Sequence, residues 1–266
     1  MPTREANDRM WRAFLDGDLE GIAELKRILR RVPSAPRCKL CQAPFSGPGG
    51  AVLKITPFRR WRANSALCSI CTGGLGDSVG GAEGEATFLF ADIRGSTSVA
   101  EHMRPAEFQG ILQRFYKVAA VAIDGSGGLV DKYLGDGVVG LFVPVFTGEV
   151  APAAAAIRAG RAILDGVGPG NGGPTWLPVG VGVHSGLAYI GVLGTEGGQL
   201  DFTAVGDAVN TAARLGSVAG AGELLVSMDA ATRANLAIES LERRTLELKG
   251  REELVDVVVL TETVSA

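Results

Sequence analysis

The sequence predicts an α+β protein in which a β-α-β-β-α-β domain follows a small N-terminal module. Three observations support this prediction. Short apolar runs alternate with segments of helical periodicity from residue 85 to residue 262. All 4 cysteines lie within residues 37–74. A glycine-rich polar stretch, residues 75–84, is typical of a flexible linker between the two regions.

The composition is that of a chain with a buried core. Of the 266 residues, 46% are hydrophobic and 21% are charged, which excludes a disordered tail. The formal net charge of -3 gives no reason to expect nucleic acid as a partner. No apolar run is long enough for a membrane span, and the N-terminus lacks a signal-peptide pattern. We therefore expect a cytoplasmic protein.

Residues 1–36 are predicted to be an amphipathic helical segment. Apolar residues between positions 7 and 31 recur at helical spacing. Gly17 lies between two aspartates and is expected to divide this segment into two helices. Pro33 and Pro36 then end the helical pattern, because proline cannot continue it.

Residues 37–74 carry two C-x-x-C pairs, Cys38 with Cys41 and Cys68 with Cys71. In an intracellular chain such pairs indicate a metal site rather than disulfides. The spacing is typical of a zinc ribbon or treble clef, so we expect a closed, structural Zn²⁺ site that contributes folding free energy. Iron and unmetallated thiols remain alternatives, because four thiolates do not identify the metal.

The main domain, residues 85–262, alternates strand and helix patterns. A β-α-β-β-α-β order with additions is the ferredoxin-like or palm arrangement. Gly135 and Asp136 form the turn of its central hairpin. The expected elements are a strand at 86–91, a helix at 105–123, strands at 128–133 and 137–143, a helix at 151–164, strands at 179–183 and 188–192, a helix at 205–215, and strands at 223–227 and 254–260.

Two aspartates mark a predicted metal site. Asp92 follows the first strand and Asp136 lies in the hairpin turn, and these places are neighbours in a palm fold. With the backbone carbonyl of Ile93, they can bind two Mg²⁺ or Mn²⁺ ions per active site, which would activate a hydroxyl and stabilise a transferring phosphoryl group. Alone, Asp92 also fits a helix N-cap, and Asp136 followed by Gly137 also fits an ordinary turn. The small residues that follow favour a turn whose amides face a triphosphate: Gly95, Ser96 and Thr97.

Four segments occur in order along this domain: FLFADIRGST (88–97), DKYLGDG (131–137), VGVHSG (181–186) and DFTAVGDAVNTAARL (201–215). Together they resemble the class III adenylate/guanylate cyclase homology domain, over roughly residues 85–260. Four segments in the right order and spacing are a specific signal. The resemblance implies the palm fold and a two-metal reaction on a nucleoside triphosphate.

The resemblance also implies that Asp92 and Asp136 bind the metal ions and that Lys132 and Thr203 contact the purine. A lysine at the position of Lys132 is similar to adenylate cyclases, whereas guanylate cyclases typically carry a glutamate there. An ammonium group can donate to N1 of adenine but opposes the N1–H of guanine. Thr203 resembles the class IIIb subgroup, several members of which respond to bicarbonate or CO₂, so bicarbonate is a candidate regulator. Strand preference alone also explains a threonine here.

Three further positions match the family. Asn210 matches the residue that orients the ribose, and Arg214 matches the arginine that stabilises the transition state. Their i, i+4 spacing places both on one helix face, and a guanidinium fork suits phosphate oxygens. Lys249, in the segment LELKG, is a looser match to a lysine that contacts the terminal phosphates.

Family members complete each active site from two protomers. One provides the metal-binding aspartates, and the other provides the purine, ribose and transition-state residues. This chain carries both sets, so the resemblance implies a homodimer that converts ATP to cyclic AMP and pyrophosphate. Residues 194–199 are expected to form the tip of a hairpin arm that helps the dimer form. The alternatives are a guanylate cyclase and a degenerate nucleotide-binding module, although no expected functional residue is missing.

Overall fold

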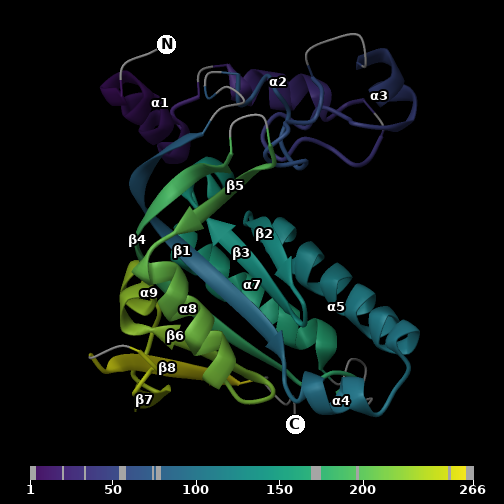
Figure 1. Ribbon diagram of the computed structural model, residues 1–266. Coiled ribbons are helices and arrows are strands. Elements are labelled where there is room, and N and C mark those ends of the chain that lie inside the picture. The colour runs from purple at the N-terminus through teal and green to yellow at the C-terminus, as the bar shows by residue number, and fades with distance from the viewer. Residues whose placement is uncertain are drawn as a thin grey trace. The chain divides into compact units, whose positions relative to one another are not determined.

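The computed structural model describes residues 4–19, 21–32, 34–53, 58–73, 75, 79–168, 175–195, 198–250 and 253–261 (Figure 1). The chain divides into two compact units. The cysteine unit comprises Met1–Gly84 and Tyr189–Val205, and the sheet unit comprises Glu85–Ala188 and Gly206–Ala266. Among the described residues, no helix is both long and apolar enough to cross a bilayer.

A mixed β-sheet follows the order β2-β3-β1-β4-β6-β8-β7, with β5 added beside β4. β4 and β6 are parallel, whereas β1 and β3 are antiparallel. The chain order is β1-α5-β2-β3-α7-β4, where α5 is Pro105–Gly125 and α7 is Pro152–Val167, and the strand order is β2-β3-β1-β4; together they confirm the predicted palm core. The strands are β1 (Gly80–Ile93), β2 (Leu129–Leu134), β3 (Gly137–Phe142), β4 (Val179–Gly194), β5 (Leu200–Val205), β6 (Glu223–Ser227), β7 (Glu242–Leu246) and β8 (Val255–Thr261).

In the sheet unit, α5 and α7 lie side by side on one face of the sheet and α8 lies on the other (Figure 1). Helix α5 begins at a proline, and the Arg104 N–H donates to the Glu107 carboxylate at 3.2 Å. The helices of this unit are α4 (Ser96–Glu101), α5 (Pro105–Gly125), α6 (Pro144–Thr147), α7 (Pro152–Val167), α8 (Asp207–Val218) and α9 (Met228–Arg233).

The cysteine unit contains helices α1 (Arg4–Asp16), α2 (Ile22–Leu29) and α3 (Gly47–Leu53). The predicted division of the first helical segment is confirmed. Gly17 and Gly21 have φ angles of 87° and 76°, a left-handed conformation that ends one helix and precedes the next.

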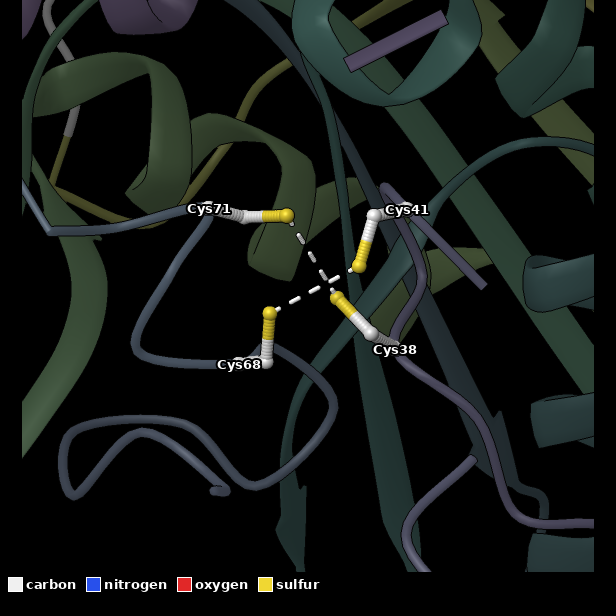
Figure 2. A group of neighbouring side chains, drawn as sticks. All are labelled: Cys38, Cys41, Cys68 and Cys71. Carbon is white, nitrogen blue, oxygen red and sulfur yellow. Dashed lines mark hydrogen bonds between the residues drawn. The ribbon is translucent and has the colours of Figure 1, made fainter. Parts of the chain in front are cut away.

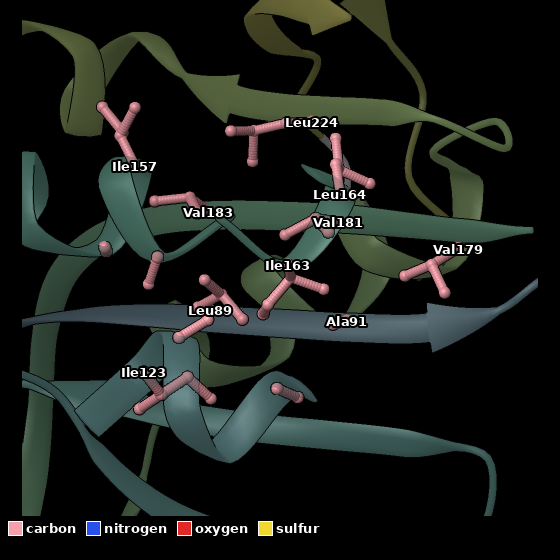
Figure 3. Packing of buried hydrophobic residues seen from close by; sticks show 14 of the residues in the cluster. Leu89, Ala91, Ile123, Ile157, Ile163, Leu164, Val179, Val181, Val183 and Leu224 are labelled. Carbon is pink, nitrogen blue, oxygen red and sulfur yellow. The ribbon is translucent and has the colours of Figure 1, made fainter. Parts of the chain in front are cut away.

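Alternating side chains of the strands supply two apolar layers. Figure 3 shows Leu89, Ala91, Val181 and Val183 packed with Ile163 of α7. On β6 and β8 the alternate residues turn to the opposite face, where they pack against Leu215 of α8. Each fully buried Leu, Ile or Val contributes about 1.5–3 kcal/mol, so these layers hold the helices on the sheet.

Two glycines let α8 approach the sheet at backbone distance. A Cβ on Gly182 of β4 would lie 2.1 Å from the backbone nitrogen of Gly216. A Cβ on Gly216 would lie 2.9 Å from the Cβ of Phe90 on β1. Because no larger residue fits, these glycines determine where α8 lies.

The structure differs from the sequence prediction at β1. This strand begins at Gly80, so residues 80–84 of the expected linker are strand, while residues 76–78 lie outside the described residues. A Cβ on Gly81 would lie 2.5 Å from the carbonyl oxygen of Ile190, and one on Gly191 would lie 2.2 Å from that of Gly80. These glycines permit close strand packing rather than flexibility.

The prediction of two strands at 179–183 and 188–192 is wrong, because β4 is a single strand from Val179 to Gly194. Polar residues in its middle are satisfied by partners from other strands. His184 Nδ1 lies 2.8 Å from Ser227 Oγ, and Ser185 Oγ lies 2.7 Å from Thr87 Oγ1. The sequence analysis also missed β5, β7 and the short helices α3, α4, α6 and α9.

We expect Gly182→Ala to lower the free energy of unfolding by about 1–3 kcal/mol, because its Cβ collides with α8. The matched control is Gly110→Ala on the exposed face of α5, where a Cβ meets nothing within 4 Å. The control should raise stability by about 0.5–1 kcal/mol, since alanine favours helix. Urea unfolding followed by circular dichroism compares the two variants. Equal stabilities would contradict the close packing of α8.

Candidate active site and metal centre

The two predicted metal-binding aspartates lie side by side at the ends of β1 and β3. Asp92 is paired with Gly137, and the Ile93 N–H donates to the carbonyl of Asp136 at 3.2 Å. A Cβ on Gly137 would lie 3.8 Å from Asp92 Oδ2. The structure therefore confirms that the hairpin turn and the end of the first strand are neighbours.

Charges and hydrogen bonds surround both carboxylates. Burial raises the pKa of Asp92 above its ordinary value, while the charge of Arg94 opposes this shift and that of Asp136 adds to it. Arg94 Nη2 donates to Asp92 Oδ1, and its Nη1 donates to the Ser217 carbonyl at 2.5 Å. Ser96 Oγ donates to Asp136 Oδ2. Two carboxylates beside a backbone carbonyl are hard oxygen donors, a set that fits Mg²⁺ or Mn²⁺.

The turn after Asp92 leads directly into α4. Gly95 has a φ of 69° and precedes the helix, and the Val99 N–H donates to its carbonyl at 3.1 Å. Ser96 and Thr97 occupy the first turn of α4, where backbone N–H groups have no partner within a helix. The sequence analysis expected a turn here and did not anticipate this helix.

Lys132 lies on β2 beside an irregularity in the pairing with β3. The register shifts between Val130 and Lys132, so Asp131 is inserted as an extra residue. Lys132 Nζ lies 3.7 Å from Asp131 Oδ2, with side chains 35% and 5% exposed respectively. The sequence analysis missed this buried carboxylate beside the lysine, although the adjacent Asp-Lys pair in the segment DKYLGDG was a usable signal.

Helix α8 carries Asn210, which is exposed, and Arg214, which is half-buried. A Cβ on Gly250 would lie 3.3 Å from Arg214 Nη2, so the loop that carries Lys249 lies against the arginine. Within the described residues, no hydrogen bond or ion pair joins Asn210 or Arg214 to the two aspartates. Figure 1 shows α8 beside the sheet strands.

Thr203 lies on β5 in the cysteine unit, opposite Gly191 of β4, and is 5% exposed. The arm that carries it ends in a turn in which the Thr195 N–H donates to the Gln199 carbonyl at 3.4 Å. This turn lies at the hairpin tip expected from the sequence, and residues 196–197 lie outside the described residues.

The four cysteines converge with their sulfur atoms facing one another (Figure 2). Cys38 Sγ lies 3.9 Å from Cys71 Sγ, and Cys41 Sγ lies 3.6 Å from Cys68 Sγ. All four sulfurs lie within 4.8 Å of one another, and all four residues are buried. Zinc bonded to four sulfurs at about 2.3 Å would place those sulfurs about 3.8 Å apart. The separations fit one tetrahedral metal ion.

Each C-x-x-C pair forms a tight turn that directs both of its sulfur atoms toward the centre of the cluster. The Gln42 N–H donates to the Cys38 carbonyl at 2.9 Å, and the Thr72 N–H donates to the Cys68 carbonyl at 3.3 Å. Hydrogen bonding within the cluster, first with Cys41, lowers the pKa of the Cys38 thiol, whereas hydrogen bonding, first with Cys38, raises the pKa of the Cys41 and Cys71 thiols. Deprotonated sulfur is the form that binds metal.

Comparison with known proteins shows which family this chain resembles. Residues 150–261 match the family described as the adenylate and guanylate cyclase catalytic domain. A solved guanylyl cyclase, Cya2, has a TM-score of 0.62 and 27% identity, covering 68% of this chain and 93% of that one. The chain therefore contains a class III cyclase catalytic domain. The solved adenylyl cyclase CyaB from P. aeruginosa also resembles this cyclase domain, with a TM-score of 0.58 and 25% identity over 69% of this chain and 97% of that one.

A curated adenylate cyclase from Anabaena cylindrica is 31% identical over 213 residues, which cover 76% of this chain. The match spans 42% of that relative's length. Both adenylyl and guanylyl cyclases thus resemble this cyclase domain, so the family alone leaves the purine open.

We expect the purified chain to hold one metal ion at the cysteines, and Cys41→Ser or Cys68→Ser to weaken metal affinity more than about tenfold. The matched control is Ile70→Ala, an exposed side chain between two of the cysteines, which should keep full metal content. Elemental analysis and chelator competition measure the effect and identify zinc or iron. Unchanged affinity in both serine variants would contradict the site.

Proposed function

We propose that the cyclase domain converts ATP to 3′,5′-cyclic AMP and pyrophosphate, as an adenylate cyclase. The observation that carries this proposal is Lys132, half-exposed on β2 with Asp131 beside its amine. Its ammonium group can donate to N1 of adenine, whereas the same atom of guanine carries a hydrogen and opposes it. Thr203 can accept from the adenine amino group, and we propose it as the second purine contact.

The carboxylates of Asp92 and Asp136, with the carbonyl of Ile93, would hold two Mg²⁺ or Mn²⁺ ions. When bound, such ions offset triphosphate charge and lower the pKa of the attacking hydroxyl. The position of α4 after Asp92 supports a role in phosphate binding for the backbone amides of a short run: Gly95, Ser96 and Thr97.

We propose that Asn210 orients the ribose and that Arg214 stabilises charge on the phosphoryl oxygens. The 3′-oxygen forms a bond to the α-phosphorus, the bond from that phosphorus to the pyrophosphate oxygen breaks, pyrophosphate departs, and the proton of the 3′-hydroxyl is released to water. The contact between Gly250 and Arg214 supports a role for Lys249 at the terminal phosphates. Bicarbonate or CO₂ as a regulator rests on Thr203 alone and stays a prediction from the sequence.

We also propose that two copies of the chain share each active site. Asn210 is exposed and makes no described bond to Asp92 or Asp136, as expected if the two sets serve different sites. At the cysteines we propose a structural Zn²⁺ ion, with iron as the alternative. Guanylate cyclase activity and nucleotide binding without catalysis are the competing functions.

We expect cyclic AMP formation from ATP with Mn²⁺, and a specificity constant at least about tenfold higher for ATP than for GTP. Lys132→Glu should reverse this preference, because a carboxylate accepts from guanine N1–H. The control Lys117→Glu makes the same charge change at an exposed site on α5 and should keep the wild-type preference for ATP. Competing ATP and GTP in one assay measures the ratio. Wild-type preference for GTP would overturn the assignment, and no product from either nucleotide would favour a non-catalytic module.

We expect Asp92→Ala and Asn210→Ala, each inactive alone, to recover about a quarter of wild-type activity when mixed, because half of the dimers then hold one intact site of two. The control mixture is Asp92→Ala with Asp136→Asn, which damages the same half and should stay inactive. Cyclic AMP formation after subunit exchange measures recovery. Equal activity in both mixtures would argue against a shared site.

A further inference from the structure

The metal centre is joined to a tight hairpin, residues 60–68, here called the Trp61 hairpin. Arg60 pairs with Cys68 as an isolated β-bridge, and the Trp61 N–H donates to the Leu67 carbonyl at 2.8 Å. The Lys39 N–H, from the first cysteine pair, donates to the Ala66 carbonyl at 2.9 Å. Both cysteine pairs therefore hold this hairpin, one covalently through Cys68 and one through a backbone hydrogen bond.

The Trp61 hairpin in turn holds β5. The Phe202 N–H donates to the Ala63 carbonyl at 2.9 Å, on the edge of β5 away from β4. The Trp61 and Phe202 ring centroids are 5.6 Å apart. Trp11 of α1 stacks against the same ring at 6.0 Å with an interplanar angle of 9°. Phe202 is fully buried, so its side chain and its amide are both fixed by the cysteine unit.

Thr203 follows Phe202 directly in the strand and pairs with Gly191 of β4. β5 is short, and β4 contacts only one of its edges, so the bond to Ala63 constrains the other edge. An edge strand that loses such a bond gains freedom at the backbone. Movement of Phe202 would be passed to Thr203 through a single peptide unit.

We infer that Trp61, held in place by the metal-loaded cysteines, is a positioning residue for purine binding, because it fixes Phe202 and therefore Thr203. This inference rests on the proposed purine contact of Thr203 and on metal binding by the cysteines. Metal loss or a smaller residue at position 61 loosens β5. Affinity for ATP and discrimination against GTP then fall, while the chemical step, which uses residues of the sheet unit, is retained.

The test uses the full chain and compares Trp61→Ala with Trp61→Phe. Trp61→Ala should keep its metal ion, raise KM for ATP about tenfold and lower the ATP/GTP ratio, with kcat within about twofold. Trp61→Phe should recover most of the wild-type KM, because an aromatic ring still packs on Phe202. Arg62→Ala, an exposed neighbour in the same hairpin, is the control and should match wild type. A fall in kcat with unchanged KM and unchanged ATP/GTP ratio would overturn the inference.

Metal removal by a chelator should raise the KM of the wild type for ATP as Trp61→Ala does. It should raise the KM of the Trp61→Ala variant little further, because both changes act through the contact of Trp61 with Phe202. Amide hydrogen exchange at residues 200–205 tests the same link without activity. Exchange there should quicken on chelation and in Trp61→Ala. Unchanged exchange overturns the inference even in an active enzyme. Faster exchange in a protein that makes no cyclic nucleotide would instead refute the proposed function and leave the link standing.

Discussion

The antiparallel pairing of β1 with β3 is the interaction on which the candidate active site depends. Its register sets Asp92 opposite Gly137 and so brings Asp136 beside it. The same register turns Leu89, Ala91 and Ile93 into the core, and a slip of one residue would exchange the two faces of β1. Burial of the apolar face thus holds the carboxylates together, although burial of Asp92, with the charge of Asp136 adding to it, raises the pKa of Asp92.

Asp92 alternates with those core residues and therefore points to the face of Phe90, the face on which α8 packs. Gly182 and Gly216 let that helix approach to backbone distance, and the bond from Arg94 to the Ser217 carbonyl ties its end to the aspartate. The helix that carries Asn210 and Arg214 is consequently rigidly placed on the sheet. Rigid elements of this kind would hold polar groups in the geometry that the proposed phosphoryl transfer requires.

The cysteine unit is organised around a different interaction, the convergence of four buried sulfurs. The stretch between the two cysteine pairs is too short to form a core of its own, so a metal ion would contribute a large part of its folding free energy. The aromatic cluster of Trp11, Phe14, Trp61 and Phe202 then joins helix, hairpin and β5 into one core. For that reason, the position of β5 depends on the stability of the metal centre.

The sequence by itself determined the order of the palm core, the adjacency of Asp92 and Asp136 and the convergence of the cysteines. The order of the elements follows from alternation and turn residues, the adjacency of the aspartates follows from the palm fold that this order predicts, and the convergence of the cysteines follows from the spacing within and between the two pairs. Only the tertiary structure decided that β4 is one strand, because Ser227 and Thr87, distant in sequence, satisfy its polar residues. It likewise decided that Gly80 and Gly81 serve close strand packing rather than a linker, and that Phe202 is held by Ala63 and Trp61. Glycine permits both flexibility and close approach, and only the neighbouring backbone determines which of the two applies.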